Sequence, residues 1–178
     1  MLRGVTLSRS SALRLAYRGA YLAARIWWFI RRPHTEGAVV AIWHGRRLLL
    51  VRTSYRVHYT LPGGFVERGE TSREAAAREL FEEIAVVIAP ADLGMGWKGT
   101  LRFEHRRDTV TIWELFVEAP PTLQVNASEL VWAGWRTVDE ARRLPLLPHV
   151  QQYLAAGGGE PARGIKNSAP GEVASRSY

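Results

Sequence analysis

The chain of 178 residues has no cysteine, which excludes disulfide bonds and thiolate metal sites. Lysine is almost absent as well: only Lys98 and Lys166 occur among 24 basic residues, and the rest are arginine. A hydrophobic content of 47% is enough for one globular domain with a substantial core. The sequence has no internal repeats.

Acidic residues are missing from the first 35 positions, where Glu36 is the first. This segment carries seven arginines, and the remaining 143 residues hold 17 basic and 17 acidic side chains. The whole formal charge of +7 therefore lies in the leader. A nucleic-acid-binding protein more often spreads basic charge over its body, so the sequence gives no specific nucleic-acid signal. The leader arginines are Arg3, Arg9, Arg14, Arg18, Arg25, Arg31 and Arg32.

A charge-free run of the ~20 residues that a membrane span needs is also absent from this leader. Its pattern instead predicts a basic amphipathic helix that ends before Pro33. Three interpretations stay open: the helix packs on the domain or on a second subunit as a homodimer contact, lies in an anionic membrane interface through residues 9–32, or is a removable targeting peptide. The segment Trp27–Ile30 followed by Arg31 and Arg32 favours the interfacial anchor over the targeting peptide.

The most informative segment is GFVERGETSREAAARELFEEIAV, residues 64–86. Glu79, Glu82 and Glu83 have helical spacing and share one face of the predicted helix. Like charges in this arrangement repel one another, and a solvated helix face has no need of them. Carboxylate oxygens suit hard divalent cations such as Mg²⁺ or Mn²⁺. The pattern therefore predicts a metal site on a helix.

The residues before this helix predict a loop, a turn and a helix cap. Leu61–Gly64 is a turn signal with two adjacent glycines. Thr71 or Ser72 can cap the helix, and Glu74 stands where a capping-box partner belongs.

This segment closely resembles the Nudix box, Gly-x5-Glu-x7-Arg-Glu-U-x-Glu-Glu-x-Gly-U, in which U is a bulky aliphatic residue. The wider resemblance runs from about Gly37 to about Leu154. Ala85 is the one departure, because the family has glycine there; a left-handed conformation would cost alanine about 1 kcal/mol or more without removing a ligand. The matching positions are Gly64, Glu70, Arg78, Glu79, Leu80, Glu82, Glu83 and Val86.

The resemblance implies hydrolysis of the pyrophosphate bond in a nucleoside diphosphate linked to another moiety, with Mg²⁺ or Mn²⁺ as cofactor. It places the metal ligands at Glu79, Glu82 and Glu83, with the Gly64 carbonyl as a further ligand. It also implies that Arg78 supports the site by pairing with Glu70. Two alternatives remain: a non-catalytic nucleotide-sensing Nudix domain, and a membrane-surface pyrophosphohydrolase that acts on a lipid-linked substrate. The expected location is cytoplasmic, and association with a membrane is the alternative.

The expected fold class is α/β, a Nudix-type α/β/α sandwich with a mixed sheet, preceded by the N-terminal helix. The expected organisation is a helical leader at 1–35, the catalytic domain at 36–156 and a disordered tail at 157–178, where glycine, proline and serine dominate. Strands are predicted at 38–43, 47–52, 86–89, 96–105, 109–118 and 130–136, and short helices at 137–143 and 148–155.

The substrate must be recognised by residues outside the box, where the sequence says less. Arg102, Arg106 and Arg107 are candidates to receive phosphates, although a solvated hairpin turn around 105–108 explains them equally well. Glu104, Asp108 and Glu129 are candidates for the general base. Trp97, Trp113, Trp132 and Trp135 are more often core residues than stacking platforms, and the five histidines lack metal-ligand spacing.

Overall fold

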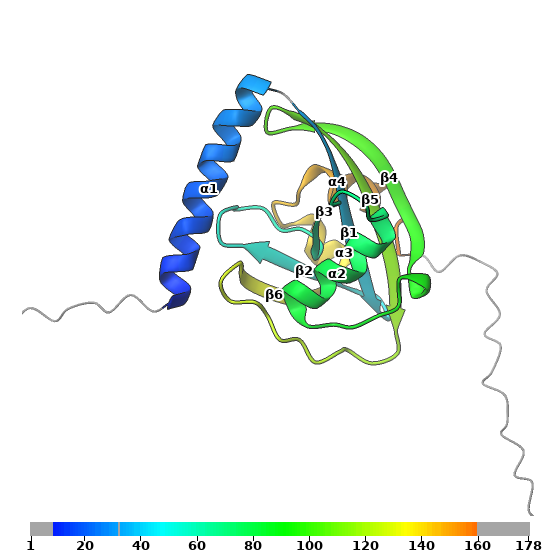
Figure 1. Ribbon diagram of the computed structural model, residues 1–178. Coiled ribbons are helices and arrows are strands. Elements are labelled where there is room, and N and C mark those ends of the chain that lie inside the picture. Colours follow the sequence, from blue (N-terminus) through cyan, green and yellow to red (C-terminus); the bar gives the residue numbers. More distant parts are fainter. Residues whose placement is uncertain (1–8, 32, 160–178) are drawn as a thin grey trace, which may run out of the picture.

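The structure, a computed structural model, describes residues 9–31 and 33–159 of the chain (Figure 1). It is built on a mixed sheet in which the strand order is β4-β5-β1-β2-β6, with the short β3 also paired to β1. The strands are β1 His34–His44, β2 Arg47–Thr53, β3 Gly63–Phe65, β4 Gly94–Phe103, β5 Arg106–Val117 and β6 Leu130–Thr137. The helices are α1 Arg9–Arg31, α2 Ser72–Ile84, α3 Val138–Arg142 and α4 Pro148–Ala155, with a 3₁₀ turn at Pro90–Asp92.

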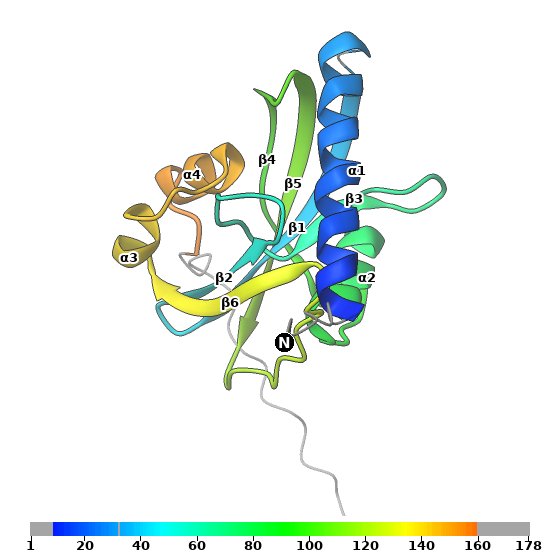
Figure 2. The same ribbon diagram turned by 90° about the vertical axis from the view of Figure 1, so that its left-hand side faces the viewer.

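The central strand β1 runs parallel to β5 and antiparallel to β2 and β3. Figure 2 shows α2 on one side of the sheet and α3 and α4 on the other. The prediction of an α/β/α sandwich with a mixed sheet and a preceding helix is confirmed.

Alternation along β1 produces two hydrophobic cores, because successive side chains of a strand point to opposite faces. Ala38 and Val40 pack with the buried face of α2, which includes Leu80. Val39 and Ala41 pack on the other side with α3 and α4. The continuous apolar run in β1 is thus typical of a strand covered on both faces.

The prediction of a strand at 86–89 is wrong, since these residues form an extended loop. Val86 is buried against α2, and its N–H bonds Leu80 O at 3.2 Å instead of a neighbouring strand. The predicted hairpin turn is also displaced. It lies at Glu104 and His105, both with positive φ, so β5 already begins at Arg106.

The helix predicted in the leader is present and spans Arg9–Arg31. Figure 1 shows that this helix, α1, lies beside the sandwich. Trp28 on its inner side is buried. Arg14 Nε donates to Ala127 O at 2.9 Å and Arg18 Nε to Ser54 O at 3.1 Å, so side chains attach the helix to the domain. None of the helices in the described ranges is both long and apolar enough to span a membrane. Of the predicted tail, residues 160–178 lie outside the described residues, as does Arg32.

Candidate active site

Two glycines bring the backbone of β3 against β1 and against α2. At Gly63, φ is 136°, and an added Cβ would lie 2.3 Å from Ala38 O. At Gly64, an added Cβ would meet the Glu79 carboxylate at 2.4–2.9 Å. Backbone atoms exclude a side chain at Gly63, and a side chain at Gly64 would displace the Glu79 carboxylate, so the two glycines let the loop approach the acidic face of the helix closely.

The predicted helix cap is present and sets where α2 begins. The Thr71 side chain accepts from Glu74 N at 3.3 Å, and Glu74 Oε2 accepts from Thr71 N at 2.7 Å. This reciprocal capping box satisfies two N–H groups at the helix start. It fixes the helical register from which the downstream acids project.

Arg78 connects the loop before the helix to the acids on it. Its guanidinium binds Glu70 through Nη2 at 2.8 Å and Nε at 3.2 Å, the bidentate geometry that arginine favours with a carboxylate. The same group donates from Nη2 to Phe65 O at 3.1 Å. Its Nη1 contacts Glu79 at 2.9 Å and Glu82 at 3.2 Å. The pairing of Arg78 with Glu70 that the family resemblance implied is formed.

Glu83 is the most deeply buried acid of the helix, with 4% of its surface exposed. Its Oε2 accepts a hydrogen bond from Gly63 N at 2.9 Å. Burial raises its pKa well above the usual glutamate range, and the nearby carboxylates of Glu129, Glu79 and Glu82 raise it further. A buried carboxylate surrounded by other carboxylates is costly unless a cation accompanies it.

The other two predicted ligands lie on the same side of α2. Glu79 is half-buried beside Gly64, and burial raises its pKa despite the opposing effect of Arg78. Glu82 is 54% exposed, with its carboxylate on Arg78. The structure therefore brings Gly64, Glu79 and Glu83 together at the loop, with Glu82 at the rim.

These residues fit a hard divalent cation by two observations. The donors are all oxygen atoms, as Mg²⁺ and Mn²⁺ prefer, and burial and nearby carboxylates disfavour the anionic form of Glu83, which a cation would stabilise. In residues 9–31 and 33–159, however, no three acidic or histidine side chains already converge as a closed metal site. Glu79 and Glu82 turn to the Arg78 guanidinium instead.

The three general-base candidates are placed differently. Asp108 and Glu129 both line the cavity next to the acidic loop, whereas Glu104 does not. Asp108 is buried and accepts from the Thr35 hydroxyl. Glu104 pairs with Arg56 at 3.1 Å and accepts from the Tyr21 hydroxyl. Burial raises the pKa of Glu129, and the charge of Glu82 adds to this effect.

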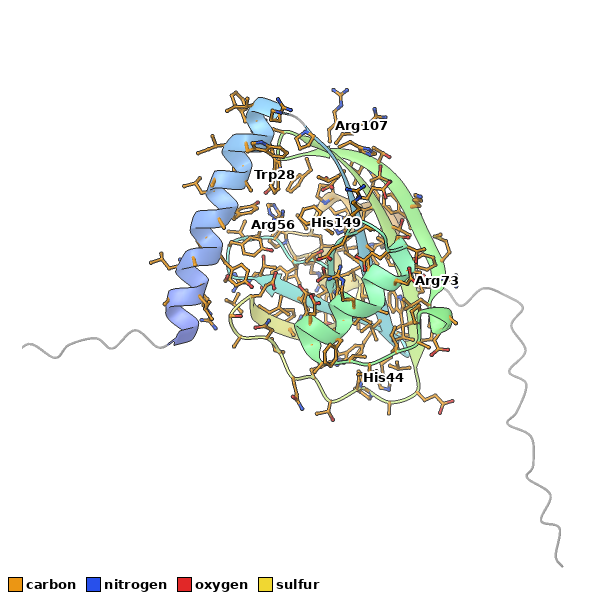
Figure 3. All side chains as sticks on the ribbon, in the orientation of Figure 1. Trp28, His44, Arg56, Arg73, Arg107 and His149 are labelled. Atoms are coloured by element: carbon orange, nitrogen blue, oxygen red, sulfur yellow. The ribbon has the colours of Figure 1, made fainter. Side chains whose placement is uncertain are left out.

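A cavity of about 440 Å³ lies between α1 and the domain, with the acidic loop at one end. Figure 3 shows Trp28, Arg56 and His149 around this space. The sequence interpretation missed these lining residues, because they come from segments that are far apart in the chain. The repeat of aromatic and small side chains at Tyr17, Ala20, Tyr21, Ala24 and Trp28 was the available signal.

The other candidates for substrate contact lie away from this cavity. Arg102 and Arg107 are exposed and paired across the hairpin of β4 and β5, and neither lines the cavity. The side chain of Arg106 is outside what the structure describes. The four tryptophans named from the sequence do not line the cavity either; Trp113 is buried, and its Nε1 donates to Ser72 O at 3.1 Å. Among the histidines, His149 does line it.

Ala85 ends α2 in the left-handed conformation, with φ 56° and ψ 30°. Its N–H bonds Phe81 O at 3.0 Å, so the helix ends where a glycine would end it. Alanine pays a steric cost of about 1–2 kcal/mol in this conformation.

We expect Ala85→Gly to raise the free energy of unfolding by about 1 kcal/mol, which corresponds to about 2–4 °C in the thermal midpoint. Thermal unfolding followed by circular dichroism measures this shift. Ala77→Gly, in the middle of the same helix, is the matched control and should lower the stability by about 1 kcal/mol. Equal destabilisation by both substitutions would contradict the assignment of strain to Ala85.

Comparison with known proteins supports the same reading of the loop and helix. Residues 33–156 match the family model of the NUDIX domain. An uncharacterized Nudix hydrolase, YvcI of Bacillus subtilis (strain 168), is 27% identical over 121 residues, which cover 64% of this chain and 74% of that relative.

Solved structures share the fold at low sequence identity. The MutT NUDIX hydrolase from Burkholderia pseudomallei has a TM-score of 0.61 at 19% identity, covering 68% of this chain and 96% of that one. A bifunctional NMN adenylyltransferase/ADP ribose pyrophosphatase from Francisella tularensis, complexed with AMP and a Mn ion, has a TM-score of 0.61 at 18% identity. This match covers 80% of this chain and 47% of the other.

Proposed function

We propose that this chain, which belongs to the Nudix hydrolase family, hydrolyses the pyrophosphate bond of a nucleoside diphosphate linked to another moiety. The observation that carries the proposal is Glu83, a buried carboxylate held by Gly63 N and surrounded by other acids. This costly arrangement of acids suits a hydrolase that works with divalent cations, and it favours that function over a non-catalytic sensor.

Each residue of the site has a role that its position supports. Glu79, Glu82 and Glu83, with the Gly64 carbonyl, would hold Mg²⁺ or Mn²⁺, which neutralises phosphate charge and lowers the pKa of bound water. Arg78 orients Glu79 and Glu82 and ties them to the loop through Glu70. Among the base candidates, Glu129 is favoured, since it lines the cavity, and burial together with the Glu82 charge raises its pKa.

The experiment is a screen of nucleoside diphosphates linked to sugars, nucleosides or phosphate groups, in the presence of Mg²⁺ or Mn²⁺. The phosphorylated products are separated and identified by chromatography. The wild-type protein should cleave at least one compound, and Glu82→Gln should lose at least about tenfold in kcat/KM. Glu118→Gln, an exposed acid outside the site, is the matched control. Binding of a compound without cleavage would support the sensor and overturn the hydrolase.

A second candidate, a pyrophosphohydrolase at the membrane surface, is favoured by the outer face of α1. Leu15, Leu22, Ile26 and Ile30 repeat at helical spacing, and all four are exposed on the side opposite the cavity. Exposed Arg25 lies at the edge of this face, and the helix carries no acid. A basic helix without an acid complements an anionic lipid surface.

We therefore expect the full chain to sediment with vesicles containing phosphatidylserine, less so at high salt, and weakly with neutral vesicles. Replacing Leu22 and Ile26 together by serine should lower the partition coefficient roughly tenfold or more, since each buried leucine or isoleucine is worth about 1.5–3 kcal/mol. Val87→Ser, at an even more exposed apolar site on the domain, is the control. Equal binding by all three proteins would refute membrane contact through this face.

A further inference from the structure

The inner face of α1 is built differently from its outer face. Tyr17, Tyr21 and Trp28 repeat at spacings of four and seven residues and point to the cavity with the small Ala20 and Ala24 between them. Residues 9–31 precede the segment that matches the family model, which begins at residue 33. This wall of the cavity is thus supplied by a part of the chain outside the matched domain.

Tyr55 and Arg56 contact Tyr21 of α1 and complete an aromatic cluster in the cavity lining. The Tyr21 and Tyr55 ring centroids are 4.8 Å apart, and the Tyr21 and Trp28 centroids 6.1 Å. The Arg56 guanidinium lies 5.0 Å from the Tyr21 ring centroid and 5.6 Å from that of Tyr55. Side chains that stack in this way form an apolar surface for planar groups.

Arg56 adds directional hydrogen-bond donors to this surface. Its Nε donates to the Tyr21 hydroxyl at 3.1 Å and its Nη2 to Glu104 at 3.1 Å, so the guanidinium is fixed in place. Neither of these two bonds uses Nη1. A guanidinium has five N–H donors, and those of Nη1 remain for a ligand. Burial raises the pKa of Tyr55 to about 12, which keeps its hydroxyl protonated.

The two ends of the cavity therefore suit two parts of one ligand. The acidic end, with Gly64, Glu79 and Glu83, suits a diphosphate with its cations, while the aromatic end suits a planar group with acceptors on its edge. A lipid chain would leave the Nη1 donors of the largely buried Arg56 without acceptors, which is costly. A nucleobase offers both a ring face and edge acceptors.

We propose that Tyr21 and Trp28 on α1, with Tyr55 and Arg56, form a subsite that binds the nucleobase of the substrate and sets base selectivity. This rests on the proposed function, because the diphosphate is expected at the acidic end. The leader helix is thereby a specificity element of the enzyme, besides any contact that its outer face makes.

The test uses nucleoside monophosphates, which have no phosphoanhydride bond to cleave, and ribose 5-phosphate, which has no base. Isothermal titration calorimetry on the full chain should show at least one of AMP, GMP, CMP and UMP binding about tenfold or more tightly than ribose 5-phosphate. Trp28→Ala should lower this nucleotide affinity roughly tenfold and leave ribose 5-phosphate unchanged.

Trp27→Ala is the matched control, because Trp27 is 52% exposed and outside the cavity whereas the adjacent Trp28 is 7% exposed. Arg56→Lys keeps the charge but loses the planar fork, and should reduce discrimination among the four bases. Its thermal midpoint and that of Trp28→Ala show whether each variant folds. If Trp28→Ala does not fold, the same binding measurements are made on Trp28→Leu and Arg56→Lys.

Two outcomes would overturn the subsite: no nucleotide binds better than ribose 5-phosphate, or the Trp27 and Trp28 variants lose affinity equally. These outcomes are separate from the fate of the proposed function. Cleavage without base preference would refute the subsite alone. Base binding that depends on Trp28, in a protein that cleaves nothing, would refute the hydrolase and retain the subsite.

Discussion

Replacing Glu83 by glutamine is expected to abolish most hydrolysis while making the metal-free protein more stable. The substitution removes an anionic ligand, and charge stabilisation by a bound cation is worth several kcal/mol, so kcat/KM should fall roughly 10²- to 10³-fold. The same substitution removes a buried charge that the other acids disfavour. Glutamine keeps an oxygen that can accept from Gly63 N.

The pH dependence of stability provides an independent measurement of the same residue. The folded-state pKa of Glu83 is raised, so the folded protein binds more protons than the unfolded chain. Its stabilising contribution is full below the unfolded glutamate pKa of about 4.3 and is lost as the pH rises through the folded pKa. In EDTA, the thermal midpoint of wild type should decline over this range more steeply than that of Glu83→Gln.

Adding Mg²⁺ or Mn²⁺ should reverse the order of the two thermal midpoints, so that wild type becomes more stable than Glu83→Gln. A ligand that binds the folded state raises its stability, so the wild-type midpoint should increase with the metal and that of Glu83→Gln much less. Exposed Glu118→Gln serves again as the control and should follow wild type in activity and midpoint. A Glu83→Gln protein with wild-type activity, or one destabilised in EDTA at neutral pH, would contradict the role given to this carboxylate.

The second large effect is expected for Arg78→Lys. Lysine retains the positive charge but cannot bind Glu70 bidentately while also reaching Phe65 O, Glu79 and Glu82. Loss of a residue that orients metal ligands typically costs 10- to 100-fold in activity or metal affinity. We expect that loss in kcat/KM, accompanied by a higher Mg²⁺ or Mn²⁺ concentration for half-maximal rate.

Arg73→Lys is the matched control on the same helix. The Arg73 guanidinium lies 4.6 Å from the Trp113 ring centroid and is outside the cavity, so its replacement should leave the metal dependence unchanged. A positioning role for Arg78 predicts partial recovery of the rate at high metal concentration. An Arg78→Lys protein with an unchanged metal requirement would instead assign Arg78 to packing of the loop.

The local parts of the candidate site could be predicted because short sequence segments determine them. The capping box at Thr71 and Glu74 and the bidentate pair of Glu70 and Arg78 depend on residues at most eight positions apart. Helical spacing alone put the three acids on one face of α2. Predicting a strand at 86–89 failed for the opposite reason, because strand formation needs a partner and Val86 packs against α2 instead.

The sequence by itself determined the family, the acids of the helix and the separation of charge between leader and domain. Only the tertiary structure decided that Glu83 is the buried acid and that Trp28, unlike Trp27, faces the cavity. It also placed Arg56 and Glu129 beside a helix and a loop that are distant in the chain. Spacing along a helix defines its faces, but which face becomes buried depends on the surface it meets, and that surface is assembled from the whole fold.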